Sequence, residues 1–111
     1  MSKAMSIQDI LKHEYSTVFD LKRQNAIVVS YYKYGPSKTN FKEGLVDAIG
    51  CLKKCLKKFE ETGNTEYLID VANYAMFRYM YPQGEECYRA TDSNESAGIV
   101  GMSIKEMEEY K

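Results

Sequence analysis

Apolar residues recur at helical spacing along most of this chain. In residues 7–23 they fall three and four positions apart, and Ser6 and Asp9 precede them in the spacing of a capping box. This pattern predicts an N-terminal helix over 7–23. The following segment, 26–34, combines β-branched residues and tyrosines with an equally good helical period, so its pattern is compatible with either a strand or a helix.

The clearest pattern predicts a helical hairpin. A long apolar stripe over 41–62 starts with Asn40 and Glu43 in capping spacing, and Gly63 follows it as a typical helix stop. A second helix over 65–81 starts almost at once, and so short a connection makes the two helices antiparallel neighbours. We therefore expect a mainly α-helical fold centred on this hairpin.

The last part of the chain lacks a sustained period. Residues 83–102 are rich in glycine, serine and acidic residues, which predicts a long loop that either covers a site or forms a mobile tail. Ser103 and Glu106 then have the spacing of a cap for a short C-terminal helix. We expect one domain, residues 1–111.

Composition narrows the classes of function. The chain has 111 residues, of which 44% are hydrophobic, and its formal charge is -1, which gives no basis for generic nucleic acid binding. No apolar run approaches the length of a membrane span, and no signal peptide is evident. The three cysteines fit a reducing, cytoplasmic setting, and with the single histidine they make only a weak metal-binding pattern. A catalytic triad is not apparent either, because His13 has no identifiable nucleophilic partner.

The helix over 65–81 carries the most informative polar group. It is apolar on most sides, but Glu66, Asp70 and Asn73 share a narrow stripe with Phe77. Glu66 is explained by the helix dipole, whereas Asp70 and Asn73 place acceptors and an amide donor on one face. Two interpretations stay open. These residues form a binding surface, or they hold the fold together, with Asp70 bonded to a tyrosine or to Arg78 and Asn73 to a loop.

A second candidate surface precedes a Gly-Pro turn. It consists of Tyr31, Tyr32, Lys33 and Tyr34, and the chain has ten tyrosines in total. Tyrosine offers a large, rigid and amphipathic contact area, which suits a binding protein. The same tyrosines would equally well fill a small core.

Four acids on the hairpin suggest a different function. Glu43 and Asp47 on one helix, with Glu66 and Asp70 on the next, resemble the paired acidic motifs of the all-α nucleoside triphosphate pyrophosphatases of the MazG and dimeric dUTPase group. That resemblance implies a Mg²⁺ site and an NTP pyrophosphatase activity. However, both acid pairs are four residues apart rather than three, and a helical wheel turns Glu43 and Asp47 away from the seam that meets the second helix.

A broader resemblance covers most of the chain from about residue 25 onward. The motifs YYKYGP, GNTEYLIDVANYAMFRYMYP and TDSNESAG resemble small accessory proteins encoded by phages and prophages of Gram-positive bacteria. This resemblance implies a non-enzymatic inhibitor that antagonises a host defence system in the cytoplasm of an infected bacterium. Its partner would be a host defence protein or a small nucleotide signal, no cofactor would be needed, and we expect a homo-oligomer.

Overall fold

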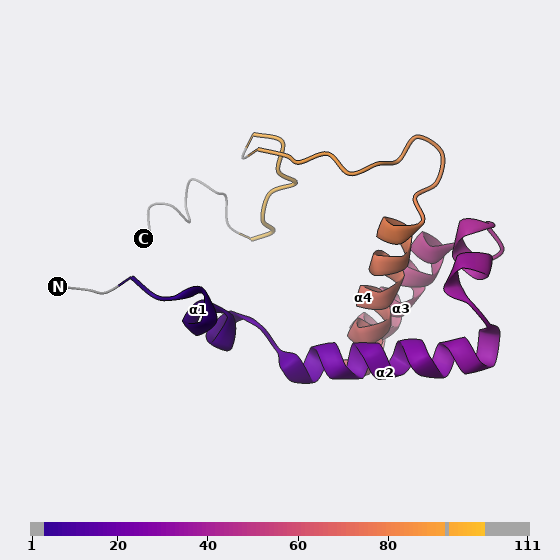
Figure 1. The fold of residues 1–111 in the computed structure, drawn as a ribbon, viewed down its shortest axis with the longest axis horizontal. Coiled ribbons are helices and arrows are strands. Elements are labelled where there is room, and N and C mark those ends of the chain that lie inside the picture. Colours follow the sequence, from indigo (N-terminus) through magenta and orange to yellow (C-terminus); the bar gives the residue numbers. More distant parts are fainter. Residues whose placement is uncertain (1–3, 93, 102–111) are drawn as a thin grey trace.

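The part of the chain that the structure describes, residues 4–92 and 94–101, contains helices and no strand. The structure is a computed structural model, and Figure 1 follows its chain from one end to the other. Its elements, in chain order, are α1 (Ile7–Glu14), α2 (Thr17–Tyr34), the single π-helical turn η1 (Lys38–Lys42), α3 (Ala48–Thr62) and α4 (Glu66–Met80). The mainly α-helical fold predicted from the sequence is confirmed.

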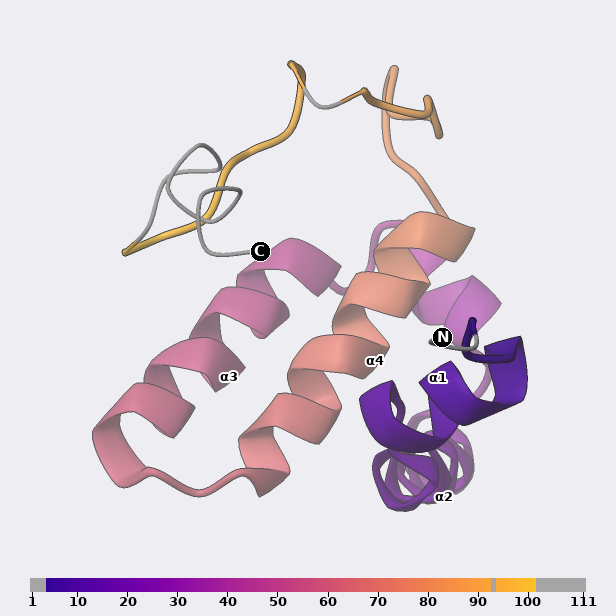
Figure 2. The same cartoon turned by 90° about the vertical axis from the view of Figure 1, so that its left-hand side faces the viewer.

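The α3–α4 hairpin forms the most extensive contact between two elements of the described chain, and Figure 2 shows the two helices side by side. Gly63 ends α3 with a left-handed φ of 69°, and its N–H donates to the carbonyl of Phe59. Residues with a Cβ are strained at this φ, so glycine suits the turn. The predicted hairpin is confirmed, and the side-chain oxygen of Asn64 accepts the N–H of Glu66 at the start of α4.

The first helix of the hairpin begins later than the sequence predicts. Instead of one helix over 41–62, the chain makes the η1 turn, passes Gly44 at a φ of 77° and enters α3 at Ala48. The left-handed glycine interrupts the helical hydrogen bonds. The amide of Asn40, expected to cap a helix here, donates instead to the carbonyl of Tyr34 at the end of α2.

The N-terminal helix predicted over 7–23 is two helices. Ser6 caps α1 in the predicted way, but Tyr15 is extended, with φ -126° and ψ 143°, and ends it. The hydroxyl of Ser16 then accepts the N–H of Phe19 at 3.0 Å and starts α2. This second serine cap competes successfully with continuation of the first helix.

The undecided segment 26–34 is the second half of α2. Ala26 and Ile27 are half-buried beside α4, so packing between helices overrides the strand preference of the β-branched residues. The helix ends at Gly35, which has a φ of 83° and whose N–H donates to the carbonyl of Tyr31. The helix thus continues without a break from Thr17 to the Gly-Pro turn.

A polar contact joins α2 to the hairpin where the two cross (Figure 1). The Nδ2 amide of Asn73 on α4 donates to the backbone carbonyl of Arg23 on α2 at 3.0 Å. The guanidinium of Arg23 pairs with Asp20 at 2.7 Å and donates to the sulfur of Met76 at 3.1 Å. These contacts fix the position of α2 along α4.

The hydrophobic core around this crossing is small. Among the described residues only Ala48, Ile69 and Phe77 are buried apolar side chains. Phe77 stacks on Phe41 of η1, with ring centroids 4.6 Å apart and ring planes 15° apart. The η1 turn is therefore attached to α4 by an aromatic pair.

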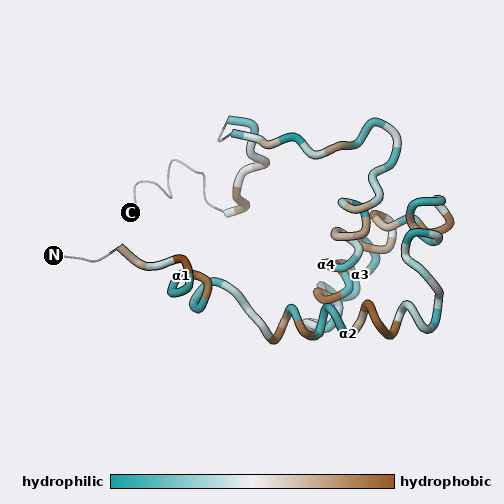
Figure 3. The backbone as a smooth tube through the Cα atoms, viewed as in Figure 1, coloured by the Kyte–Doolittle hydropathy of each residue, from teal (hydrophilic) through white to brown (hydrophobic). Residues whose placement is uncertain are grey.

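The molecule is more open than a compact domain. Its radius of gyration is 17.6 Å, whereas about 13 Å is typical for a chain of this length. Helix α1 lies apart from the hairpin (Figure 1) and carries hydrophobic positions (Figure 3). Its Ile7 and Leu11 side chains are exposed. None of the described helices combines the length and the apolar character that crossing a bilayer requires.

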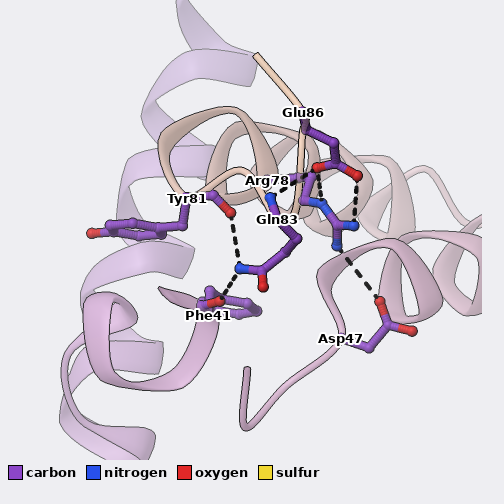
Figure 4. A network of polar contacts seen from close by, with 6 residues as sticks. All are labelled: Phe41, Asp47, Arg78, Tyr81, Gln83 and Glu86. Carbon is purple, nitrogen blue, oxygen red and sulfur yellow. Dashed lines mark hydrogen bonds and ion pairs between the residues drawn. The ribbon is translucent and has the colours of Figure 1, made fainter. Parts of the chain in front are cut away.

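The chain after α4 has no helix or strand over its described residues, which agrees with the predicted loop over 83–102. Its beginning is attached to the fold, because the guanidinium of Arg78 forms two hydrogen bonds with the carboxylate of Glu86, at 2.6 and 2.9 Å (Figure 4). The short helix predicted from Ser103 lies outside the described residues.

We predict that Phe77→Ala lowers the free energy of unfolding by about 3–5 kcal/mol, because it removes a buried ring from a small core. Tyr79→Ala, two residues further along α4, is the matched control, since Tyr79 is 70% exposed. Urea denaturation followed by circular dichroism at 222 nm measures both. Equal losses for the two variants would show that Phe77 does not form the core.

Candidate functional site

A cleft of about 290 Å³ opens between α2, η1 and α4. Its size lies just below the range for sites of drug-sized molecules, about 300–1,000 Å³. Most of its large lining side chains are aromatic and come from all three elements: Tyr31, Tyr34, Phe41, Tyr74 and Phe77. The cleft is therefore suited to a flat, largely apolar group.

Asn73 supplies the main polar feature of the cleft. Its side chain is only 6% exposed, and its Nδ2 amide is occupied by the carbonyl of Arg23. Its Oδ1 atom has no hydrogen-bond partner among the described residues. An unpaired buried acceptor costs about 1–3 kcal/mol, so a ligand that donates a hydrogen bond to this oxygen recovers that free energy.

Asp70 lies one helical turn before Asn73 and also lines the cleft. Burial, and secondarily the neighbouring charge of Glu66, raise the pKa of its carboxyl group. Within the described chain its carboxylate takes part in no hydrogen bond or ion pair of the structure. Asp70 therefore offers a second acceptor in a place where its negative charge is poorly compensated.

The groups behind Asp70 stay protonated at neutral pH. The pKa of the Tyr74 hydroxyl is raised to about 12, mainly by burial. The neighbouring Cys51, Cys55 and Asp70 raise it further. Burial likewise raises the pKa of the Cys55 thiol. A thiol with a raised pKa is a poor nucleophile. Of these groups Tyr74 lines the cleft, as a protonated hydroxyl, whereas Cys55 lies outside it.

The structure brings together five of the residues that the sequence singled out. Tyr31 and Tyr34 from α2 line the same cleft as Asp70, Asn73 and Phe77 from α4. The two surfaces that the sequence treated separately are thus opposite walls of one cleft.

The other two residues of the tyrosine segment lie elsewhere. Tyr32 is 83% exposed and outside the cleft, where its ring meets that of Tyr31 edge to face at 5.8 Å. Lys33 borders a separate open groove between α2 and the start of α4.

Arg78 attaches the start of the loop after α4 to that helix, and it does not line the cleft. Its guanidinium holds Glu86, and the N–H of Gln83 donates to the same carboxylate at 3.1 Å (Figure 4). The hydrogen bonds from Arg78 and Gln83, of which that from Arg78 has the larger effect, lower the pKa of the Glu86 carboxyl group to about 2. The amide of Gln83 also donates to the carbonyl of Phe41, so this network connects the loop to η1.

The four acids considered for Mg²⁺ are not brought together. Asp47 lies 3.9 Å from the guanidinium of Arg78, near the end of α4, whereas Glu66 is the first residue of that helix. Arg78 follows Asp70 by eight residues, a rise of about 12 Å along the axis. Glu43 is exposed just after η1. Across the described residues, no three histidine, cysteine or acidic side chains are grouped to hold a metal ion.

Sequence reasoning missed the side chains that complete the cleft. The sequence predicts Asn40 as a helix cap and Phe41 as the start of a continuous helix, yet both line the cleft from the η1 turn. Tyr74 on α4 also lines the cleft. Gly44 was the available signal, because a glycine inside an otherwise strong helix pattern often marks a break.

Comparison with known proteins adds no further constraint: no protein family, curated protein or solved structure was found to match this chain.

We predict that Asp70→Asn stabilises the unliganded protein at neutral pH, by no more than about 1 kcal/mol because solvent still screens the partly exposed group. The raised pKa means that the folded state binds the proton more tightly than the unfolded chain, so the charged form destabilises the fold. The advantage of the variant should disappear as the pH falls through the folded and then the unfolded pKa.

Urea denaturation at several pH values measures this difference, and Glu60→Gln on the exposed side of α3 is the control. A loss of stability for Asp70→Asn at neutral pH would mean that the carboxylate has a stabilising partner.

Proposed function

We propose that this protein is a non-enzymatic binding protein that holds the base of a nucleotide in the cleft between α2, η1 and α4. The observation that carries the proposal is the buried Oδ1 of Asn73, which lies beside aromatic side chains and has no hydrogen-bond partner among the residues that the structure describes. We further propose that it is phage-encoded and sequesters a nucleotide signal of a host defence system, in the cytoplasm of the infected bacterium.

The chemistry of the cleft supports a base with an exocyclic amine. Stacking on aromatic side chains contributes about 1–3 kcal/mol per base. An asparagine can contact adenine through both its amide and its oxygen, but the amide of Asn73 is already used by Arg23. The free oxygen therefore favours a single contact with an N–H donor, and Asp70 offers an acceptor one turn away.

Discrimination should depend on the same acceptor. A site built to hydrogen-bond a ligand N–H rejects an analogue without it, because its own polar group is then left unpaired. Purine riboside differs from adenosine by the missing exocyclic amine. The pair therefore separates hydrogen bonding to Asn73 from stacking alone.

An NTP pyrophosphatase with Mg²⁺ is the second candidate function. It requires Glu43, Asp47, Glu66 and Asp70 to surround one metal site, and Asp47 lies near the opposite end of α4 from Glu66. Sequestration needs only the acceptors and aromatic walls of the cleft. His13 belongs to α1, which does not contribute to the cleft.

Isothermal titration calorimetry of the full chain with adenosine, cyclic adenosine nucleotides and ADP-ribose tests the proposal. We predict a Kd of about 1–100 μM for at least one adenine ligand, and binding at least about tenfold weaker for purine riboside, a loss of about 1.4 kcal/mol. Asn73→Ala should weaken adenine binding to the same extent and reduce the difference between adenosine and purine riboside.

A second variant covers the case in which Asn73→Ala fails to fold. Ser30→Phe places a ring in the cleft from α2 and should abolish binding, whereas Lys54→Phe on the outer side of α3 adds the same ring without effect. Absence of binding to every nucleotide base would overturn the proposal. Pyrophosphate released from dNTPs with Mg²⁺, and lost in Asp70→Ala, would instead support the enzyme.

A further inference from the structure

The outer side of α2 carries an exposed apolar seam. Its members follow one another at alternating spacings of three and four residues: Val18, Leu21, Asn25, Val28 and Tyr32. The four apolar members are between 54% and 83% exposed, and Asn25 is exposed as well. At about 100° per residue, all lie within about 60° of Asn25, while Arg23 and Ile27 lie about 160° away, on the side that meets α4.

This spacing is that of the contact seam of a coiled coil. Alternation of three and four residues keeps one narrow stripe facing a partner helix. In Figure 1 the hairpin lies on one side of α2 and the opposite side is uncovered. Val18 and Asn25 also border the open groove beside the start of α4, so a helix on the seam would cover part of this groove.

The chain as a whole exposes more area than is typical of a compact monomer of its size. The chain exposes 9666 Å², whereas about 6,300 Å² is typical of a monomer of 12.8 kDa. The difference is about 3,400 Å² per chain, and an obligate homodimer buries about 1,000–2,500 Å² of each partner. This excess belongs to the whole chain, including the exposed segment after α4, and burial of the seam would remove part of it.

We propose that α2 binds α2 of a second copy of this chain, antiparallel, with Asn25 at the two-fold axis. Asn25 lies midway along the seam, seven residues from both Val18 and Tyr32. A carboxamide is both donor and acceptor, so Asn25 can pair with the partner's Asn25, and a polar residue at such a position fixes the register.

The side-chain volumes favour the antiparallel orientation. Around this axis the large Tyr32 meets the partner's Val18, and Leu21 meets the partner's Val28, so large and small side chains alternate. A parallel pair would place Tyr32 against the partner's Tyr32 and leave space between the two valines. In the antiparallel pair Lys22, which flanks the seam, faces neutral residues instead of the partner's Lys22. The same surface of both copies forms the contact, as a two-fold interface requires.

This interface uses a different side of α2 from the proposed nucleotide binding. The cleft is lined by Ile27, Ser30, Tyr31 and Tyr34 of α2, and the two surfaces meet where the ring of Tyr32 contacts that of Tyr31. A dimer would therefore leave two open clefts facing away from each other.

Sedimentation equilibrium of the full chain tests the association. We predict a mass of twice 12.8 kDa at micromolar concentration, and a dimer dissociation constant at least about 100-fold higher for Leu21→Glu, because an unpaired charge would be buried. Leu45→Glu is the matched control, since Leu45 is 70% exposed and outside the seam. A wild-type monomer at 100 μM, or equal weakening by both variants, would overturn the proposal.

Disulfide trapping tests the orientation. Asn25→Cys should form a covalent dimer on mild oxidation, because the two positions meet at the axis. Tyr32→Cys should not, since the two positions would be about 20 Å apart in the antiparallel pair. Wild type, which has three cysteines of its own, is the control. Trapping by Tyr32→Cys would indicate a parallel pair and overturn the two-fold at Asn25.

Discussion

The hydrogen bond from Asn73 to the carbonyl of Arg23 is the contact on which the arrangement of this protein depends. The α3–α4 hairpin is a local structure that its short turn determines. Helix α2, in contrast, must be placed by contacts distant in sequence, and few buried apolar side chains are available to do so. A buried amide that finds its acceptor at one point of α2 specifies a position, because any shift would leave the amide unpaired.

That placement determines both surfaces of α2. One side, with the aromatic residues of η1 and α4, encloses a cleft that Asn73 lines, and the buried Oδ1 acceptor of this residue has no partner in the described part of the chain. The other side remains exposed with its apolar seam. So small a hydrophobic core is compatible with a stable fold if self-association adds to the stability. A partner that binds only the folded state stabilises that state. The proposed ligand binding and the proposed self-association would thus use opposite sides of one helix.

The sequence predicted the elements whose signals are local. The period of α4, the stop at Gly63 and the polar face with Asp70 and Asn73 were all recognisable from spacing alone. Helix boundaries were less accessible, because the break at Tyr15 depends on competition between two serine caps. The helical state of Ile27 and its neighbours depends on packing against α4, and propensity alone does not contain that information.

The site could be predicted only in part for the same reason. Its α4 residues share a helix face, which a wheel reveals, and the tyrosines of α2 were noticed through their composition. That they face each other follows from the crossing of α2 and α4. The contribution of Phe41 follows from the interruption at Gly44, which places η1 beside Phe77. Both are consequences of tertiary structure.

Hydrogen exchange of the Asn73 side-chain amide, followed by NMR, tests the central claim most directly. If this amide joins α2 to α4, its protons should exchange at least about tenfold more slowly than those of the exposed Asn64. Exchange of Asn73 as fast as that of Asn64 would mean that the bond to Arg23 is not kept in solution, and would contradict the arrangement of α2 from which both surfaces follow.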